Sequence, residues 1–255
     1  MTYRILDLFS GIGGFSLGLE RTGGFKTAAF CEIDPFCRRV LAKHWPDVPC
    51  YDDIRTLTAA ALRRDGIAVD VICGGFPCQD ISESNHSGLG LDGERSGLWF
   101  EYARLIGELR PRAALVENTA ALLGRGIDRV LGSLAALGYD AEWHSIPASA
   151  LGAPHERDRV WLVAYPAETF GRQVVSWRDL ARQHAILGKR AEDAGRTSVF
   201  SEASWHRSWR EVAHAAGLLD DGLSRGFHGF DALANAVVPQ IPELIGRAIL
   251  AAEAA

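Results

Sequence analysis

A glycine-rich turn between two apolar runs near the amino terminus constrains the fold most strongly. Residues 3–9 (YRILDLF) have the composition of a short buried strand, and Ser10–Gly14 (SGIGG) follows as a turn. A helix is expected next, and then a second strand over 26–30 that ends close to Glu32. This order of strand, glycine turn, helix, strand and acid is the layout of a nucleoside-binding crevice. We therefore expect Glu32 to accept hydrogen bonds from ribose hydroxyls, with a purely structural turn as the alternative.

A second glycine-containing stretch, Gly74–Asp80 (GGFPCQD), follows the apolar run 69–73, which reads as a buried strand. Pro77 fixes its own φ and disfavours helical geometry at the preceding residue, so Cys78 is expected to sit on a stiff backbone. An isolated cysteine is more often a small packed thiol than a nucleophile. The polar, glycine-containing segment 82–95 follows, and beside a candidate nucleophile it indicates a mobile lid.

A carboxylate is expected at the same edge of the sheet as the cysteine. Residues 113–116 (AALV) read as another buried strand, and Glu117 comes directly after them. Ligands of such sheets bind outside the carboxyl ends of the strands. Glu117 and Cys78 therefore form a candidate acid and nucleophile acting on one substrate.

Two arginines precede a later apolar strand over 160–164. Arg157 and Arg159 alternate into this strand, so we expect both side chains on one face, where they could clamp a phosphate or a carbonyl oxygen. Surface ion pairs with Glu156 and Asp158 are an equally weighted alternative.

The remaining pattern indicates further helices and strands. Helices are expected over 35–44, 98–109, 127–137 and 242–252, and a strand over 141–146. The pair Asp52 and Asp53 lies near an expected third strand, where it could cap a helix or contact a cofactor base. Segment 166–221 interleaves tryptophans with basic residues, which suits either nucleic-acid contact or a small, poorly packed subdomain.

Composition limits the class of protein. The net charge of −5 argues against a polyanion-binding surface over the whole molecule, although it leaves a local cleft open. The five cysteines form no C-x-x-C pair, so neither a disulfide framework nor a zinc site is expected. No apolar run of about 18 residues and no signal pattern occur, so we expect a soluble, cytoplasmic protein without membrane association.

Taken together, these blocks resemble the DNA (cytosine-5) methyltransferases of the compact bacterial and phage type. The resemblance rests on Asp7–Phe15, Glu32–Asp34, Gly74–Ser82, Arg95–Glu101, Glu117–Asn118, Arg157–Arg159 and Asn235–Gln240, in an order and spacing that fit the family over nearly the whole chain.

The resemblance implies an α/β fold: a Rossmann-like S-adenosylmethionine-dependent methyltransferase sheet with helices on both faces, plus a small irregular target-recognition subdomain. Residues 1–165 would form the catalytic domain that binds S-adenosylmethionine, and residues 166–221 a short target-recognition region. Residues 222–255 would return to the catalytic domain beside the first glycine turn. Double-stranded DNA would lie in the cleft between the domains, a cognate restriction endonuclease is a possible partner, and a monomer is expected.

The resemblance also assigns roles to single residues. Cys78 would add to carbon 6 of a cytosine flipped out of the duplex, and Glu117 would hold nitrogen 3 and the exocyclic amine. Arg159 would hold the carbonyl oxygen of the base, and Arg157 would orient the Cys78 or phosphate side of the site. The cofactor would be lined by Phe9, Gly11, Ile12 and Gly14, bound at the ribose by Glu32 and at the adenine by Asp53 and Ile54, and flanked at the methionine end by Pro77, Leu98 and Asn235.

Some positions depart from the family pattern. His155 stands where glutamine is common and Ala234 where glycine is usual, and the recognition segment of about 55 residues is short. A catalytically weak or degenerate DNA-binding homologue therefore stays open as an alternative, as does a transfer RNA methyltransferase of the same fold. Restriction protection, phage marking and epigenetic marking are the roles that fit such an enzyme.

Overall fold

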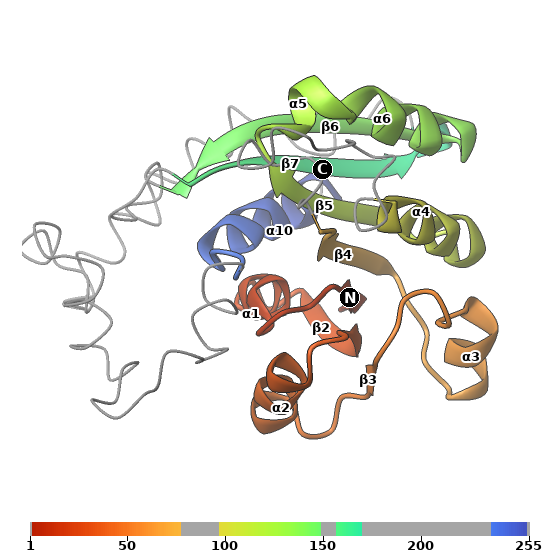
Figure 1. Ribbon diagram of the computed structural model, residues 1–255, viewed down its shortest axis with the longest axis vertical. Coiled ribbons are helices and arrows are strands. Elements are labelled where there is room, and N and C mark those ends of the chain that lie inside the picture. Colours follow the sequence, from red (N-terminus) through yellow and green to blue (C-terminus); the bar gives the residue numbers. More distant parts are fainter. Residues whose placement is uncertain (1, 78–96, 149–156, 170–235, 254–255) are drawn as a thin grey trace, which may run out of the picture.

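A seven-stranded sheet runs through the protein (Figure 1). The computed structural model describes residues 2–77, 97–148, 157–169 and 236–253. The strands are β1 (Tyr3–Leu8), β2 (Phe25–Cys31), β3 (Cys50–Tyr51), β4 (Val71–Gly75), β5 (Ala113–Thr119), β6 (Tyr139–Pro147) and β7 (Asp158–Pro166). They are arranged in the order β3-β2-β1-β4-β5-β7-β6. The first five strands pair in parallel, whereas β7 is antiparallel to both β5 and β6.

Helices cover both faces of the sheet. They are α1 (Gly14–Glu20), α2 (Pro35–His44), α3 (Ala59–Arg64), α4 (Leu98–Leu109), α5 (Leu122–Arg125), α6 (Ile127–Ala136) and α10 (Gln240–Glu253), with a short 3₁₀ turn at Ala167–Thr169. One core cluster joins Leu62 of α3, Tyr102 of α4 and Leu134 of α6 to the sheet. The other joins Leu19 of α1 and Leu244 of α10 to the opposite face.

Alternation along the strands explains the two cores. Successive side chains of a strand point to opposite faces, so neighbouring residues of β5 enter different clusters. Ala114 and Val116 pack under α4, whereas Ala113 and Leu115 pack toward α1 and α10. The central strands are apolar on both faces for this reason, as is usual for parallel strands that are buried on both sides.

The predicted α/β fold with helices on both faces is confirmed. Its predicted target-recognition subdomain lies outside the described residues. The helices expected over 35–44 and 98–109 have the predicted bounds, whereas β4 begins two residues later than predicted and includes both glycines. The short helices α3 and α5 were not predicted. Within the described residues no helix is long and apolar enough to cross a membrane.

The carboxy-terminal segment 236–253 lies against α1. Gly14 and Gly18 of α1 have no room for a side chain, because a Cβ atom would collide with Val237 and Pro239 respectively. Small residues on α1 therefore let the backbone that precedes α10 approach the helix closely. This packing places α10 beside α1 on the same face of the sheet (Figure 1).

Candidate active site

The strand order changes direction at β1: β2 and β3 lie on one side of it, and β4 and β5 lie on the other. In open sheets of this kind, the loops that leave the carboxyl ends on the two sides of such a switch point separate and form a crevice. The glycine turn leaves β1, Glu32 follows β2, and the Phe76–Pro77 segment follows β4. The candidate site therefore lies at this edge of the sheet.

The glycine turn after β1 has an unusual backbone. Phe9, Gly11 and Gly13 have φ angles of 51°, 53° and 88°. Such angles suit glycine but are uncommon for a bulky residue such as Phe9, so surrounding contacts must hold the turn. Ser10 supplies them: its hydroxyl donates to the carbonyl oxygen of Asp7 at 2.6 Å, and its amide donates to that of Cys31 at 3.3 Å.

Glu32 fastens the turn to β2. One carboxylate oxygen accepts from the Gly11 amide at 2.7 Å, and the other accepts from the Asp34 amide at 2.8 Å. A Cβ atom built on Gly11 would meet no atom within 4 Å, so the turn is open on that side. An open glycine backbone beside a carboxylate fits a nucleoside, whose ribose hydroxyls can donate to the free lone pairs of Glu32. Ile12 is half-buried, and Gly14 is buried as the first residue of α1.

Asp53 and Ile54 form a tight turn two residues beyond β3. The Asp53 carboxylate accepts from the Arg55 amide at 2.9 Å and forms an ion pair with the Arg55 guanidinium, which lowers the pKa of Asp53. The carbonyl oxygen of Asp53 accepts from the amides of Thr56 and Leu57. Asp53 thus shapes a turn ahead of α3, while the cap of α3 is Thr58. Its predicted contact with a cofactor base stays a prediction.

Glu117 lies inside β5, where its register partners are Gly75 of β4 and Trp161 of β7. Its side chain is 12% exposed, and its Oε1 atom lies 2.9 Å from Nε of Arg159. Burial raises the pKa of Glu117 above its ordinary value, although the guanidinium groups of Arg159 and Arg157 act in the opposite direction. A nearly buried carboxyl group with a raised pKa is suited to proton transfer or to donating a hydrogen bond.

The two arginines are held differently. Arg159 lies in β7, whereas Arg157 precedes that strand with a φ of 37°, so regular strand geometry does not extend to Arg157. Both guanidinium groups nevertheless act on the Glu117 carboxyl, and the predicted clamp on a phosphate or a carbonyl oxygen stays a prediction. The left-handed backbone at Arg157 turns the chain into β7. Its Nη2 atom donates to the carbonyl oxygen of Ala236 at 3.0 Å, which ties the entrance of β7 to the carboxy-terminal segment. Arg159 forms a direct ion pair with Glu117.

Asn118 is a residue whose role the sequence reasoning missed. Its side chain is buried, and its Nδ2 atom donates to the carbonyl oxygen of Phe76 at 3.1 Å. Phe76 in turn packs on Trp99 of α4, with ring centroids 5.5 Å apart. The backbone that leads to Pro77 is therefore fixed from β5 and α4. The sequence contained a signal for this role, because Asn118 directly follows Glu117 in the expected strand. Strand alternation puts the two side chains on opposite faces of the sheet, so Asn118 serves a different purpose from Glu117.

The comparison with protein families decides the assignment. The model of the family described as C-5 cytosine-specific DNA methylase matches residues 3–186. The chain belongs to this DNA methylase family. The Bacillus subtilis type II methyltransferase M2.BsuMI is 37% identical over an alignment of 169 residues, and the match covers 63% of this chain and 41% of that protein. The Lactococcus lactis type II methyltransferase M1.ScrFI is 35% identical over an alignment of 167 residues, and the match covers 64% of this chain and 41% of that protein.

A solved structure agrees with the family assignment. A prophage-encoded Escherichia coli protein, described as a DNA modification methyltransferase, superposes with a TM-score of 0.55 at 27% identity. The match covers 66% of this chain and 48% of that one. The chain thus spans about two fifths of the length of the two curated relatives and shares its sheet with a known structure.

Two residues predicted to matter in this DNA methylase family member, Cys78 and Asn235, lie outside the described residues, as do the expected lid 82–95, His155 and Ala234. Their neighbours are described. Pro77 is two residues beyond β4, and Ala236 accepts from Arg157. Leu98 is half-buried as the first residue of α4. The structure thus brings the glycine turn, Glu32, Pro77 and Glu117 to one edge of the sheet.

Proposed function

We propose that this chain methylates carbon 5 of cytosine at specific sites in double-stranded DNA, with S-adenosylmethionine as the methyl donor. The observation that carries the proposal is the nearly buried Glu117, which is paired with Arg159 and lies in register with Gly75, three residues before Cys78. Family membership supplies the reaction class. A duplex base is inaccessible in the stack, so the target cytosine must be flipped out.

In the proposed mechanism, Cys78 makes carbon 5 reactive. Its thiolate forms a bond to carbon 6 of the cytosine, and the displaced electron pair makes carbon 5 nucleophilic. Glu117 donates a proton to nitrogen 3 as the thiolate adds, for which a raised pKa suits it. After carbon 5 has gained the methyl group, the proton on carbon 5 is lost to solvent. The bond between carbon 6 and sulfur then breaks with release of the thiolate, and nitrogen 3 returns its proton to Glu117. Cys78 is then free for another turnover.

The arginines would stabilise the bound base. Arg159 would hold the carbonyl oxygen of the base while keeping Glu117 oriented through the contact between its Nε atom and Oε1 of Glu117. Arg157 would hold the entrance of β7 and the carboxy-terminal segment together. In this position it orients the Cys78 or phosphate side of the site.

The glycine turn is the proposed cofactor site. S-adenosylmethionine, when bound, supplies an electrophilic methyl group. Glu32 would bind its ribose, the backbone of Phe9–Gly14 would line it, and Asp53 and Ile54 would contact its adenine. Pro77, Leu98 and Asn235 would flank its methionine end. The open side of Gly11 next to the Glu32 carboxylate supports this assignment.

The rest of the proposal concerns how the enzyme is organised. Residues 1–165 would form the catalytic domain, 166–221 the target-recognition region, and 222–255 a segment that completes the cofactor pocket. The protein would act as a cytoplasmic monomer beside a cognate restriction endonuclease. The type II methyltransferase names of the relatives support the restriction-modification role.

Transfer of a labelled methyl group tests the proposal. The protein is incubated with labelled S-adenosylmethionine and either duplex DNA or transfer RNA, beside a Cys78→Ser variant. Label in DNA that disappears in the variant is the expected result. Label in transfer RNA alone would favour the RNA methyltransferase, and DNA binding without transfer would favour the degenerate homologue.

Trapping tests the covalent step separately. Duplex DNA with 5-fluorocytosine at the target site has no proton to lose from carbon 5, so the bond to Cys78 should persist after methyl transfer. The expected result is a protein–DNA adduct that survives denaturation and is absent from Cys78→Ser. Turnover on normal DNA without such an adduct would contradict the Cys78 mechanism.

A further inference from the structure

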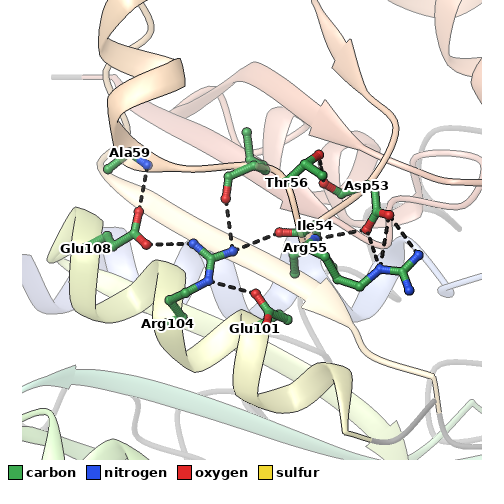
Figure 2. Close-up of polar contacts among 9 residues, drawn as sticks. Asp53, Ile54, Arg55, Thr56, Ala59, Glu101, Arg104 and Glu108 are labelled. Atoms are coloured by element: carbon green, nitrogen blue, oxygen red, sulfur yellow. Dashed lines mark hydrogen bonds and ion pairs between the residues drawn. The ribbon is translucent and has the colours of Figure 1, made fainter. Parts of the chain in front are cut away.

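Arg104 of α4 reaches across to the turn that carries Asp53 and Ile54 (Figure 2). Its Nη2 atom donates to the carbonyl oxygens of Ile54 at 2.9 Å and Leu57 at 3.0 Å. The two carbonyls belong to a turn that is 47 and 50 residues away in sequence. A single guanidinium group therefore fixes both ends of the turn.

Two glutamates on α4 hold the guanidinium in place. Its Nε atom donates to Glu101 at 2.7 Å, and its Nη1 atom donates to Glu108 at 2.6 Å. Glu108 also accepts from the amide of Ala59, the first residue of α3, at 2.8 Å. The planar fork of an arginine, with five N–H donors, can serve all these acceptors at once, whereas a lysine cannot.

We propose that Arg104 is a positioning residue for the adenine end of the cofactor. This inference rests on the proposed function, in which Asp53 and Ile54 contact the adenine. The turn depends on contacts from outside itself, because β3 ahead of it has only two residues and Arg55 and Thr56 are exposed. Arg104 supplies such contacts from a long, well-packed helix.

The same helix begins at Leu98, which is expected at the methionine end of the cofactor. Leu98 and Arg104 are six residues apart, or about 9 Å along a helix at 1.5 Å per residue. α4 would therefore set the separation between the two ends of the cofactor site. A change at Arg104 should weaken cofactor binding while leaving the chemistry at Glu117 intact.

Binding of S-adenosylhomocysteine, measured by calorimetry, tests the inference. Replacing Arg104 with glutamine should raise the Kd roughly tenfold, which corresponds to about 1.4 kcal/mol. The Kd of Arg104→Lys should lie between those of Arg104→Gln and the parent, because lysine keeps the charge but lacks the planar fork of N–H donors. The turnover number at saturating S-adenosylmethionine should change by less than about twofold, because only the bound population is altered.

Arg247→Gln is the matched control. Arg247 is similarly exposed and pairs with Glu243 four residues earlier, but it lies on α10, which packs on the opposite face of the sheet from α4 and the Asp53 turn. This variant should bind the cofactor as the parent does. Hydrogen exchange adds a local readout: in Arg104→Gln the amides of Thr56 and Leu57 should exchange faster, while those of β4 and β5 should not.

The outcomes separate the two proposals. Equal affinity of Arg104→Gln and the parent would overturn the positioning role, as would faster exchange throughout the sheet, which would indicate a merely structural residue. A parent protein that fails to bind S-adenosylhomocysteine at all would contradict the proposed cofactor, and the role of Arg104 would fall with it.

Discussion

The Oε2 atom of Glu117 lies 2.5 Å from the point where a Cβ atom on Gly75 would stand. The two residues are direct neighbours on β4 and β5, so a side chain on Gly75 would project from the same face of the sheet as that of Glu117. The absence of a side chain at Gly75 is therefore what gives the Glu117 carboxylate its position. Arg159 closes the other side of the carboxylate through the ion pair at 2.9 Å.

Replacing Gly75 with alanine should displace Glu117 and lower methyl transfer by roughly 10²-fold, the cost of a misplaced catalytic group. The fold should survive, because the colliding atom is the end of a side chain and not backbone. Methyl-transfer rates and thermal unfolding check this. Gly132→Ala is the control, since a Cβ on Gly132 of α6 meets no atom within 4 Å. An active Gly75→Ala enzyme would show that Glu117 needs no fixed position.

Changing Glu117 to glutamine should lower the rate by about 10²-fold or more, because the amide cannot transfer a proton. The raised pKa of Glu117 adds a pH signature. Its protonated fraction falls as the pH rises through that pKa, so the rate of the parent should decline on the alkaline side. Glu117→Gln should lack this declining limb in pH–rate profiles. If Glu117→Gln still showed the alkaline decline, the decline would belong to the titration of another group.

Asp7 should make the folded state less stable as the pH rises. It is fully buried, and burial raises its pKa to about 7, although Ser16 donates to it at 2.7 Å. Folding favours the neutral form of Asp7, so its burial costs no stability below about pH 4. As the pH rises from about 4 to about 7, the folded state loses roughly 4 kcal/mol, because each unit of pKa shift corresponds to about 1.36 kcal/mol. Urea unfolding between pH 4 and 8 should show that Asp7→Asn gains on the parent across this window.

Asp70 should change the stability of the folded state with pH in the opposite direction. Its ion pair with Arg4 lowers its pKa, so its contribution is present at neutral pH and is lost as the pH falls through the lowered value. Asp70→Asn should therefore cost more at pH 7 than at pH 3. A cost of Asp70→Asn that is the same at pH 3 and pH 7 would contradict this assignment.

Removing the Asn118 side chain should affect activity more than stability. Asn118→Ala leaves the buried carbonyl oxygen of Phe76 without its donor, which costs about 1–3 kcal/mol. The backbone leading to Pro77 should then lose its orientation, and the methyl-transfer rate should fall. Tyr139→Phe is the matched control, because Tyr139 donates to the carbonyl of Pro111 at 2.6 Å. Equal activity in the two variants would remove Asn118 from the site.

Much of the fold follows from local sequence pattern. The glycine turn, the apolar strands and the helix that begins at Pro35 each have their signal within a few residues, so their positions are close to those predicted. Helix α3, with six residues, is too short for a clear period and was missed. The antiparallel insertion of β7 between β5 and β6 was not predicted either, because strand order depends on contacts between distant segments.

The sequence by itself determined the family, the α/β class and the residue types of the candidate site, because each is written in short motifs such as the glycine turn and the Glu-Asn pair. Tertiary structure alone decided how those residues are held. The register of β4 and β5 puts Glu117 beside Gly75, and the left-handed backbone at Arg157 keeps this residue outside β7, the strand that contains Arg159. α4 places Arg104 against a turn some 50 residues away. Such relationships arise only when distant segments pack together, so a local sequence pattern does not predict them.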